Sequence, residues 1–357
     1  MSDKSSFRKR VERYGYALSA RSTRYICPGC GRRSFTPYVD SGNKIVCDGA
    51  GRCDREVNCG YHKSPKELGY SGPSNHMRKD PGPTFEEPDY IPKEIVSASM
   101  RRKPGEYRNS LRIYLHRLFD GLLTPEEVDD TLLRMGVGDS KLFGGSPIFW
   151  QMDSCGYVRT GKIMGYNPDT GKRIKKPRNL IRWIHKFNLK GINQDFTLRQ
   201  VYFNSHGLRP SDDTPIALFE SEKASLIFAL TLRYCGAEDL FLPMATGGIS
   251  NLNPTPENKR DPWSGIQALK GRKVILFPDE GCYEQWSEKG KGLRLFSKEV
   301  WISSVMEPFH PDKDKVGCAI EKGDGFDDLL IRYIQRGEDP SELILTSFGL
   351  DGFGRLV

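Results

Sequence analysis

The chain has 357 residues, of which 37% are apolar and 28% are charged, and its formal net charge is +8. A chain of this length can form two or three domains, and this apolar fraction is sufficient for a buried core. No apolar run approaches the roughly 20 residues of a membrane helix, and the first ten residues, MSDKSSFRKR, lack the apolar segment of a signal peptide, so we expect a cytoplasmic protein without membrane contact.

Positive charge is concentrated in the first part of the chain. Residues 1–212 contain 37 Lys and Arg against 23 Asp and Glu, a net of +14, whereas residues 213–357 contain 17 against 23, a net of −6. A basic part favours contact with a polyanion such as nucleic acid, and an acidic part favours cations. A soluble protein with uneven surface charge is the alternative interpretation.

Five of the nine cysteines lie within 33 residues near the N-terminus. A CPGC sequence opens this segment, a strand-like stretch with a DSGN turn follows, and further cysteines close it. This order is typical of a zinc ribbon, because Pro and Gly in the first turn direct two thiolates toward one ion. The odd cysteine count and the expected cytoplasmic location disfavour disulfides.

We expect residues 1–70 to form this zinc ribbon, with one structural Zn²⁺ bound by Cys27, Cys30, Cys53 and Cys59. Cys47 and His62 remain alternatives for one of the two later positions. Four protein ligands would complete the coordination of the ion, so it would stabilise the fold and would not bind substrate.

The middle of the chain is predicted to contain a linker and then a mixed subdomain. Residues 71–90 are rich in Pro, Gly and Ser, which is typical of an interdomain linker. Residues 91–212 are expected to form helices followed by antiparallel strands. Thr124, Pro125 and Glu127 mark the capped start of one helix, and from residue 146 apolar runs alternate with turns such as NPDTG.

A basic segment follows the last of these turns. It contains six positive charges within eleven residues and no acid, and it ends beside a tryptophan: Lys172, Arg173, Lys175, Lys176, Arg178, Arg182 and Trp183. Like charges repel one another, so a nucleic-acid backbone is a suitable partner, and the indole could stack on a base. An exposed basic turn without a partner is the alternative.

Residues 213–357 alternate between strands and helices. Apolar strands are expected at 216–220, 239–245 and 273–280, and helices at 221–236 and 326–337. This alternation predicts a mainly parallel sheet with helices on both faces. The expected fold class is therefore a multidomain chain with α+β and α/β parts.

Acidic residues follow two of the predicted strands. Glu220 ends the first strand, and Asp279 and Glu280 follow the third. Ligands of parallel sheets bind at the carboxyl ends of the strands, so these side chains should converge. Further acids at 324, 327 and 328 precede or begin a later helix. Clustered carboxylates suit Mg²⁺ or Mn²⁺, although acids at these positions are also common helix caps.

These segments resemble a known family. IALFESEKASLIFAL (216–230) and KVILFPDEG (273–281) resemble the two hallmark motifs of toprim domains, a catalytic glutamate after one strand and an Asp-x-Asp pair after another. The ribbon, helical, strand and toprim-like segments occur in the order of bacterial-type DNA primases, over about residues 25–335. The similarity points to the divergent primase-like proteins of phages and mobile elements.

The resemblance implies roles for particular residues. Glu220 would be the acid-base residue or a metal ligand, Asp279 a metal ligand and Asp328 an auxiliary acid, and Lys223 would face the phosphates of an incoming nucleotide. Two positions depart from the motifs. Ser221 replaces the glycine after the glutamate, and Gly281 replaces the second aspartate of the pair. Glu280 or Asp324 would then have to supply the missing metal ligand.

The resemblance predicts a metal-dependent, DNA primase-like nucleotidyltransferase. Its partners would be single-stranded DNA, nucleoside triphosphates and, as a further candidate, a replicative helicase. Two other functions fit the same residues. The chain could be a catalytically impaired accessory protein that binds single-stranded DNA, or a toprim-type nuclease that cuts DNA with the same acids.

Overall fold

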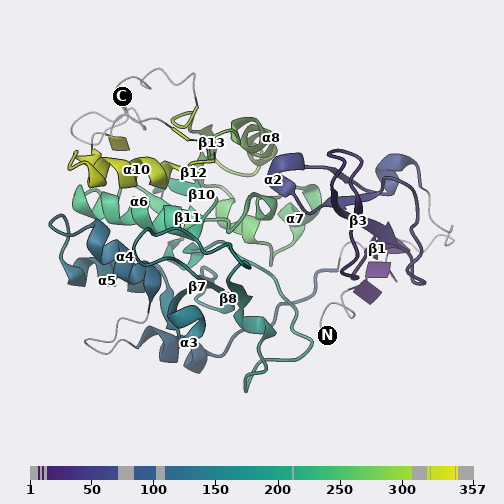
Figure 1. Cartoon of the computed structure of the whole chain (residues 1–357), viewed down its shortest axis with the longest axis horizontal. Helices are drawn as coiled ribbons and strands as arrows, with labels where there is room; N and C mark the ends of the chain where they lie inside the picture. The colour runs from purple at the N-terminus through teal and green to yellow at the C-terminus, as the bar shows by residue number, and fades with distance from the viewer. Residues whose placement is uncertain are drawn as a thin grey trace. The chain divides into compact units, whose positions relative to one another are not determined.

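The computed structural model describes residues 7–8, 10–11, 14–70, 84–101, 109–210, 213–307, 320–321, 323–341 and 343–344. The chain forms two compact units (Figure 1). The first is Met1–Thr84 with Gln194–Phe196, and the second is Phe85–Asn193 with Thr197–Val357. Most of the predicted linker, residues 71–83, lies outside the described residues. Within the described ranges, no helix is long and apolar enough to cross a membrane.

The first unit contains a small antiparallel sheet. Its strands are β1 (Ala17–Leu18), β2 (Tyr25–Ile26), β3 (Arg33–Val39), β4 (Gly51–Cys53) and β5 (His62–Lys63), in the order β1-β3-β4-β5 with β2 paired to β3. A short helix, α2 (Glu56–Cys59), precedes β5. One buried cluster of this unit consists of Cys27, Phe35 and Cys53, with Tyr61 packed against them, and Ala17, Val39 and Ala50 are buried elsewhere in the unit. Because two of the three buried members of this cluster are cysteines, a metal bound by them would stabilise the unit.

The second unit begins with helices and an antiparallel sheet. The helices are α3 (Lys93–Met100), α4 (Ser110–Leu118) and α5 (Pro125–Arg134). The sheet has the order β6-β7-β8-β9 and consists of β6 (Val137–Ser140), β7 (Ser146–Met152), β8 (Val158–Met164) and β9 (Ile181–Trp183). Thr124 and Glu127 form the predicted capping box at the start of α5, which explains why this helix could be located from the sequence.

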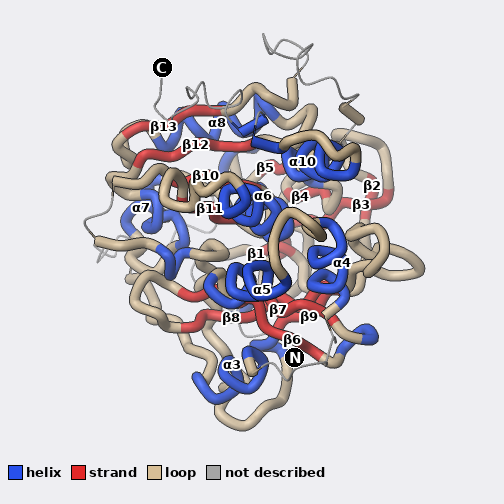
Figure 2. The backbone as a smooth tube through the Cα atoms, turned by 90° about the vertical axis from the view of Figure 1, so that its left-hand side faces the viewer, coloured by secondary structure: helices blue, strands red, loops and turns tan. Residues whose placement is uncertain are grey.

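A parallel sheet completes the second unit. Its strands are β10 (Ile216–Phe219), β11 (Leu242–Ala245), β12 (Lys273–Phe277) and β13 (Glu299–Ile302), and they lie in the order β11-β10-β12-β13 (Figure 2). The helices of this part are α6 (Glu222–Tyr234), α7 (Pro256–Arg260), α8 (Tyr283–Leu293) and α10 (Phe326–Gln335). The prediction of a mixed chain with antiparallel and parallel sheets is confirmed.

Short 3-10 helices occur in the connections. They are η1 (Lys66–Leu68), η2 (Leu142–Gly144), η3 (Ile184–Lys186), η4 (Ser205–Gly207), η5 (Ile249–Asn251) and η6 (Gly265–Leu269). The loop before η4 extends the parallel sheet, because Phe203 forms an isolated antiparallel bridge with Ala245 of β11.

Both faces of the parallel sheet are covered. On one face, Phe219 and Phe277 stack with ring centroids 4.7 Å apart, beneath Phe228 of α6 and Phe326 of α10. On the other face, Leu218 and Leu276 belong to a second apolar cluster that includes Trp286 and Leu293 of α8. A strand buried on both faces must be apolar at successive positions, which explains the sequences IALF and KVILF.

The regions expected at 91–212 and 213–357 share one core. Leu111 and Leu115 of α4 and Phe149 of β7 belong to the same buried cluster as Phe219 and Phe277. The two regions therefore form one compact unit, in which the antiparallel and parallel sheets are held by common apolar contacts.

Candidate functional site

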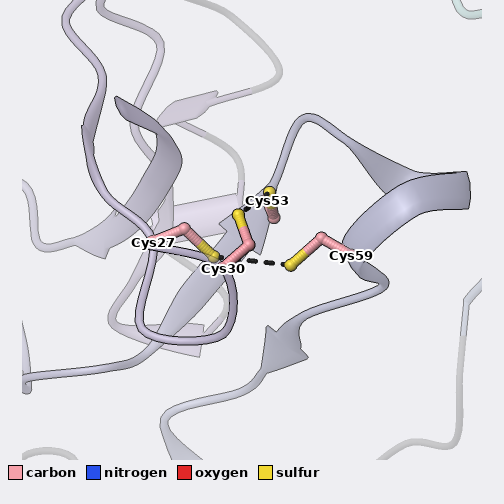
Figure 3. A group of neighbouring side chains, drawn as sticks. All are labelled: Cys27, Cys30, Cys53 and Cys59. Carbon is pink, nitrogen blue, oxygen red and sulfur yellow. Dashed lines mark hydrogen bonds between the residues drawn. The ribbon is translucent and has the colours of Figure 1, made fainter. Parts of the chain in front are cut away.

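Four cysteines converge in the first unit. The sulfur atoms of Cys27, Cys30, Cys53 and Cys59 all lie within 4.8 Å of one another, and Figure 3 shows their thiol groups turned toward a common point. The Sγ atoms of Cys27 and Cys59 are 3.7 Å apart, and those of Cys30 and Cys53 are 4.0 Å apart. A tetrahedral zinc ion with Zn–S bonds of about 2.3 Å requires sulfur–sulfur separations of about 3.8 Å. The four thiols therefore match the size of a Zn²⁺ site.

The surroundings lower the pKa of Cys30, whereas the neighbouring cysteines raise the pKa of Cys59. The amide of Arg32 lowers the pKa of Cys30 to about 6, because its hydrogen bond stabilises the negative charge. Thiolate is the form that binds zinc. The two alternative ligands have other surroundings. Cys47 is not part of the cluster, and Nε2 of His62 lies 3.0 Å from the hydroxyl of Tyr38, on whose ring the imidazole stacks.

Acidic side chains meet at the carboxyl edge of the parallel sheet. Phe219 of β10 lies in register with Phe277 of β12, so Glu220 and Asp279 leave the sheet at the same edge. The pKa of Asp279 is raised to about 8, because the side chain is partly buried and because the carboxylates of Glu220, Asp327 and Asp328 lie close to it. We call Glu220, Asp279, Asp327 and Asp328 the acidic cluster.

The start of α10 brings two of these acids to the edge. Gly325 lies beside Asp327 and Asp279, since a Cβ atom at this position would stand 2.6 Å from Oδ1 of Asp327 and 3.1 Å from Oδ1 of Asp279. Asp328 also caps the helix, because its Oδ2 accepts a hydrogen bond from the amide of Gly325 at 3.0 Å. Burial and the neighbouring Asp327 raise the pKa of Asp328.

Lys223 is paired with the acidic cluster. Its Nζ lies 2.9 Å from Oδ2 of Asp327 and 3.7 Å from Oδ1 of Asp328. Burial alone would lower the pKa of Lys223, but the two carboxylates outweigh it and raise the pKa. The sequence interpretation placed Lys223 toward a nucleotide and did not identify Asp327 as its partner.

Glu280 and Asp324 stabilise a loop beside the cluster. Oε2 of Glu280 accepts a hydrogen bond from the amide of Gly323 at 3.0 Å, and its own amide donates to the carbonyl oxygen of Asp324 at 2.8 Å. The carboxylate of Asp324 forms an ion pair with Arg332 at 2.7 Å. The backbone amide of Gly323 and the guanidinium of Arg332 in α10 are thus structural partners of these two acids.

Gly281 has a backbone reason for being glycine. Its φ is +74°, in the left-handed region that side chains with a Cβ atom disfavour. An aspartate at this position would be strained. The absence of the second acid of the Asp-x-Asp pattern is therefore consistent with the left-handed backbone of this turn.

A buried ion pair stands beside Glu220, and the sequence interpretation did not find it. Nζ of Lys162, in β8, lies 3.0 and 3.1 Å from the two carboxylate oxygens of Glu222, the first residue of α6. The side chains are 7% and 2% exposed. The only signal in the sequence was a second acid directly after Ser221, where the toprim motif has none.

The basic segment lies on the surface of the second unit. It connects β8 to β9, and its six charged side chains are exposed: Lys172, Arg173, Lys175, Lys176, Arg178 and Arg182. Across the described part of the chain, none of the six forms an ion pair. Trp183 ends β9 and is partly buried, with Nζ of Lys162 5.9 Å from its ring centroid. The segment therefore presents unpaired positive charge to solvent.

The two candidate sites differ in how closely their ligand atoms are gathered. Among the residues that the structure describes, the four cysteines are the only group of three or more Cys, His, Asp or Glu whose ligand atoms all lie within 4.8 Å of one another. The acidic cluster is more open, and Lys223 occupies part of it.

Two family models match parts of the chain. Residues 13–74 match a zinc beta-ribbon finger, and residues 109–280 match a domain of unknown function (DUF6371). The first unit carries a zinc ribbon. The ribbon match and the four-cysteine cluster together support a structural Zn²⁺ in this unit. The second match begins at the cap of α4 and ends at Glu280, so it includes the basic segment and both acid-bearing strands.

No curated protein matches the chain significantly. Among solved structures, the chain is similar to the primase fragment of the bacteriophage T7 primase-helicase protein, with 13% sequence identity and a TM-score of 0.32, over 79% of this chain and 89% of that chain.

Proposed function

We propose that the chain is a metal-dependent nucleotidyltransferase of the primase type that acts on single-stranded DNA. The observation that carries this proposal is the convergence of Glu220, Asp279 and Asp328 at the carboxyl edge of a parallel sheet. Such edges are where open α/β sheets bind their ligands. The toprim-like motifs at the same positions supply the reaction class.

The donor set of the acidic cluster suits a divalent ion. Carboxylate oxygens are the ligands that Mg²⁺ and Mn²⁺ prefer. The raised pKa of Asp279 supports this assignment, because crowded carboxylates that repel one another are stabilised by a cation. A bound ion would stabilise the charge that develops on the attacking and leaving oxygens during nucleotidyl transfer.

The chain's own residues have separate roles in this proposal. Glu220 is the candidate acid-base residue, and Asp279 and Asp328 are candidate ligands of the ion. Lys223 is paired with the buried Asp327 and is the candidate contact for the triphosphate of an incoming nucleotide. Glu280 and Asp324 are weaker candidates for the missing ligand, because Glu280 already accepts a hydrogen bond from the amide of Gly323 and Asp324 already pairs with Arg332 of α10.

The basic segment is the candidate contact for the template. Its exposed, unpaired charges suit a phosphate backbone, and Trp183 at its end suits stacking on a base. The zinc ribbon would serve as a second, structurally separate contact. A replicative helicase is a further candidate partner, and primase-like proteins of phages and mobile elements are the expected setting.

Product analysis tests the proposal. The full chain is incubated with a single-stranded template, ribonucleotides and Mg²⁺ or Mn²⁺, beside the variant Glu220→Gln. The wild-type chain should form short oligonucleotides, and the variant should form none while its thermal unfolding is unchanged. Synthesis by the variant at the wild-type rate would show that Glu220 is not the reacting acid.

A second function is favoured by the turn at Gly281. Because Gly281 supplies no carboxylate, and its left-handed backbone disfavours a side chain there, the chain could bind single-stranded DNA as an accessory protein without catalysis. The same assay then gives DNA binding without new products. A toprim-type nuclease, the third candidate, would instead shorten the template.

A further inference from the structure

Lys162 joins three parts of the second unit that are far apart in the sequence. It lies in the middle of β8, and its ammonium group contacts both carboxylate oxygens of Glu222 at 3.0 and 3.1 Å. It also donates a hydrogen bond to the carbonyl oxygen of Gly247 at 3.2 Å. Glu222 begins α6, and Gly247 follows β11. One ammonium group thus links the antiparallel sheet to the start of α6 and to the loop after β11, both at the carboxyl edge of the parallel sheet.

Glu220 lies between the two points that Lys162 contacts. It precedes Glu222 by two residues, and its carbonyl oxygen is 3.5 Å from the hydroxyl of Thr246. The amide of Thr246 also donates to the carbonyl oxygen of Phe219 at 3.0 Å. The backbone around Glu220 is therefore bounded by the start of α6 on one side and by the loop after β11 on the other.

The surroundings of Lys162 exclude water. Its side chain is 7% exposed, and that of Glu222 is 2% exposed. Trp183, its direct partner across the β8–β9 pair, covers the ammonium group with a centroid distance of 5.9 Å. Electrostatic attraction is stronger where water is excluded, so this ion pair should restrict motion far more than an exposed pair would.

We propose that Lys162 is a positioning residue: its bonds to Glu222 and Gly247 fix the backbone that carries Glu220 relative to Asp279. This inference rests on the proposed function, because it deepens the assignment of Glu220 as the reacting acid. It adds a residue that does not touch the substrate. A misplacement of about 1 Å in a reacting group can reduce a rate about 100-fold, so such a residue should affect the reaction rate strongly.

The test compares two variants with a matched control. Lys162→Met keeps the length of the side chain and removes its charge. The double variant Lys162→Met/Glu222→Met removes both charges, so that no buried charge is left without a partner. Lys273→Met is the control. Lys273 begins β12, at the end of the strand away from the acidic edge, and its Nζ forms an ion pair of 2.9 Å with Asp213.

Two measurements are made on the full-length chain. Amide hydrogen exchange is followed by mass spectrometry on two peptides. The peptide of residues 219–226 reports the motion of the start of α6, and the peptide of residues 244–250 reports the motion of the loop after β11. Oligonucleotide synthesis gives kcat, and single-stranded DNA binding without nucleotides gives Kd. In both Lys162 variants we expect exchange in these peptides to speed up, kcat to fall by about tenfold or more, and Kd to change by less than about twofold. The control should match the wild-type chain in all three.

The outcomes separate this inference from the proposed function. If the double variant keeps wild-type exchange and wild-type kcat, Lys162 does not position Glu220 and the inference is wrong. If the wild-type chain makes no products, the proposed function fails by itself. The exchange experiment then still decides whether Lys162 restricts the motion of the start of α6 and of the loop after β11. Unchanged exchange in Lys162→Met would show that it does not.

Discussion

Nζ of Lys223 lies 2.9 Å from Oδ2 of Asp327, and this buried ion pair neutralises part of the acidic cluster. Without a cation, several carboxylates at one edge would repel one another, as the raised pKa of Asp279 indicates. Lys223 limits this repulsion in the protein alone. The same arrangement would let a divalent ion compete with the lysine for the carboxylates.

Lys223→Met should therefore destabilise the protein. The side chains of Lys223 and Asp327 are 15% and 5% exposed, and removing one member of a buried pair leaves an uncompensated charge. We expect a loss of about 3–5 kcal/mol in the free energy of unfolding, measured by urea denaturation at pH 7. Lys298→Met is the control, because its ion pair with Asp213 at 3.0 Å is exposed and should be worth less than about 1 kcal/mol. Equal losses in the two variants would contradict the assigned role of Lys223.

Zinc binding should depend on Cys53 and not on Cys47. Cys53→Ser removes one of the four clustered thiols, so we expect the zinc content measured by mass spectrometry to fall well below one ion per chain. The first unit should unfold at a lower temperature, because a bound metal would join the cysteines of its buried cluster to the other two thiols. Cys47→Ser should keep both the zinc content and the unfolding temperature of the wild-type chain. Loss of zinc in this second variant would place Cys47 among the ligands.

Neutralising the basic segment should weaken single-stranded DNA binding. The triple variant Lys175→Gln, Lys176→Gln and Arg178→Gln removes three exposed charges. For single strands the salt slope changes by about 0.7 per phosphate contact, so we expect the slope of log K against log salt to fall by about 2. Fluorescence anisotropy over a range of salt concentrations measures it.

The control for this experiment is a triple variant outside the basic segment. Lys273, Lys291 and Lys298 all form ion pairs with acids, and their replacement by Gln removes the same charge from the second unit. This variant should keep the wild-type slope. If both triple variants change the slope equally, only net charge matters and the basic segment is not a binding site.

Stability should fall below neutral pH partly because of His185. Burial, together with the neighbouring Lys186, lowers the pKa of His185 to about 4, whereas in the unfolded chain its pKa is about 6.5. The unfolded state therefore takes up a proton first as the pH falls, and the stabilising contribution, fully present above pH 6.5, is lost as the pH falls toward 4. Between pH 7 and pH 4.5 the wild-type chain should lose about 2 kcal/mol more than His185→Gln, measured by urea denaturation. Parallel pH profiles for the two proteins would contradict this.

Much of the fold could be predicted because its signals are local. The apolar strands IALF and KVILF, the capping box of Thr124 and Glu127, and the CPGC turn each depend on residues within a few positions of one another. The register of neighbouring parallel strands then places Glu220 and Asp279 at one edge, as the order of strands and acids predicts. Local spacing thus located the elements and the acids that follow the strands.

The partners of the charged residues could not be predicted in the same way. Lys162 and Glu222 are 60 positions apart, and the distance between Lys223 and Asp327 is greater still. A sequence shows that these residues are charged but not which pairs become buried together. Spacing along the chain also did not show that Asp324 pairs with Arg332 or that Asp327 pairs with Lys223.

By itself, the sequence determined the zinc-ribbon pattern, the alternation of strands and helices, and the order in which acids follow strands. These depend on periodicity and short-range geometry, which act within one element. The tertiary structure decided which carboxylates face one another, which lysines neutralise them, and that Gly281 takes a left-handed turn. Those outcomes depend on the packing of distant segments around a common core, where burial strengthens electrostatic interactions and makes the choice of partner decisive.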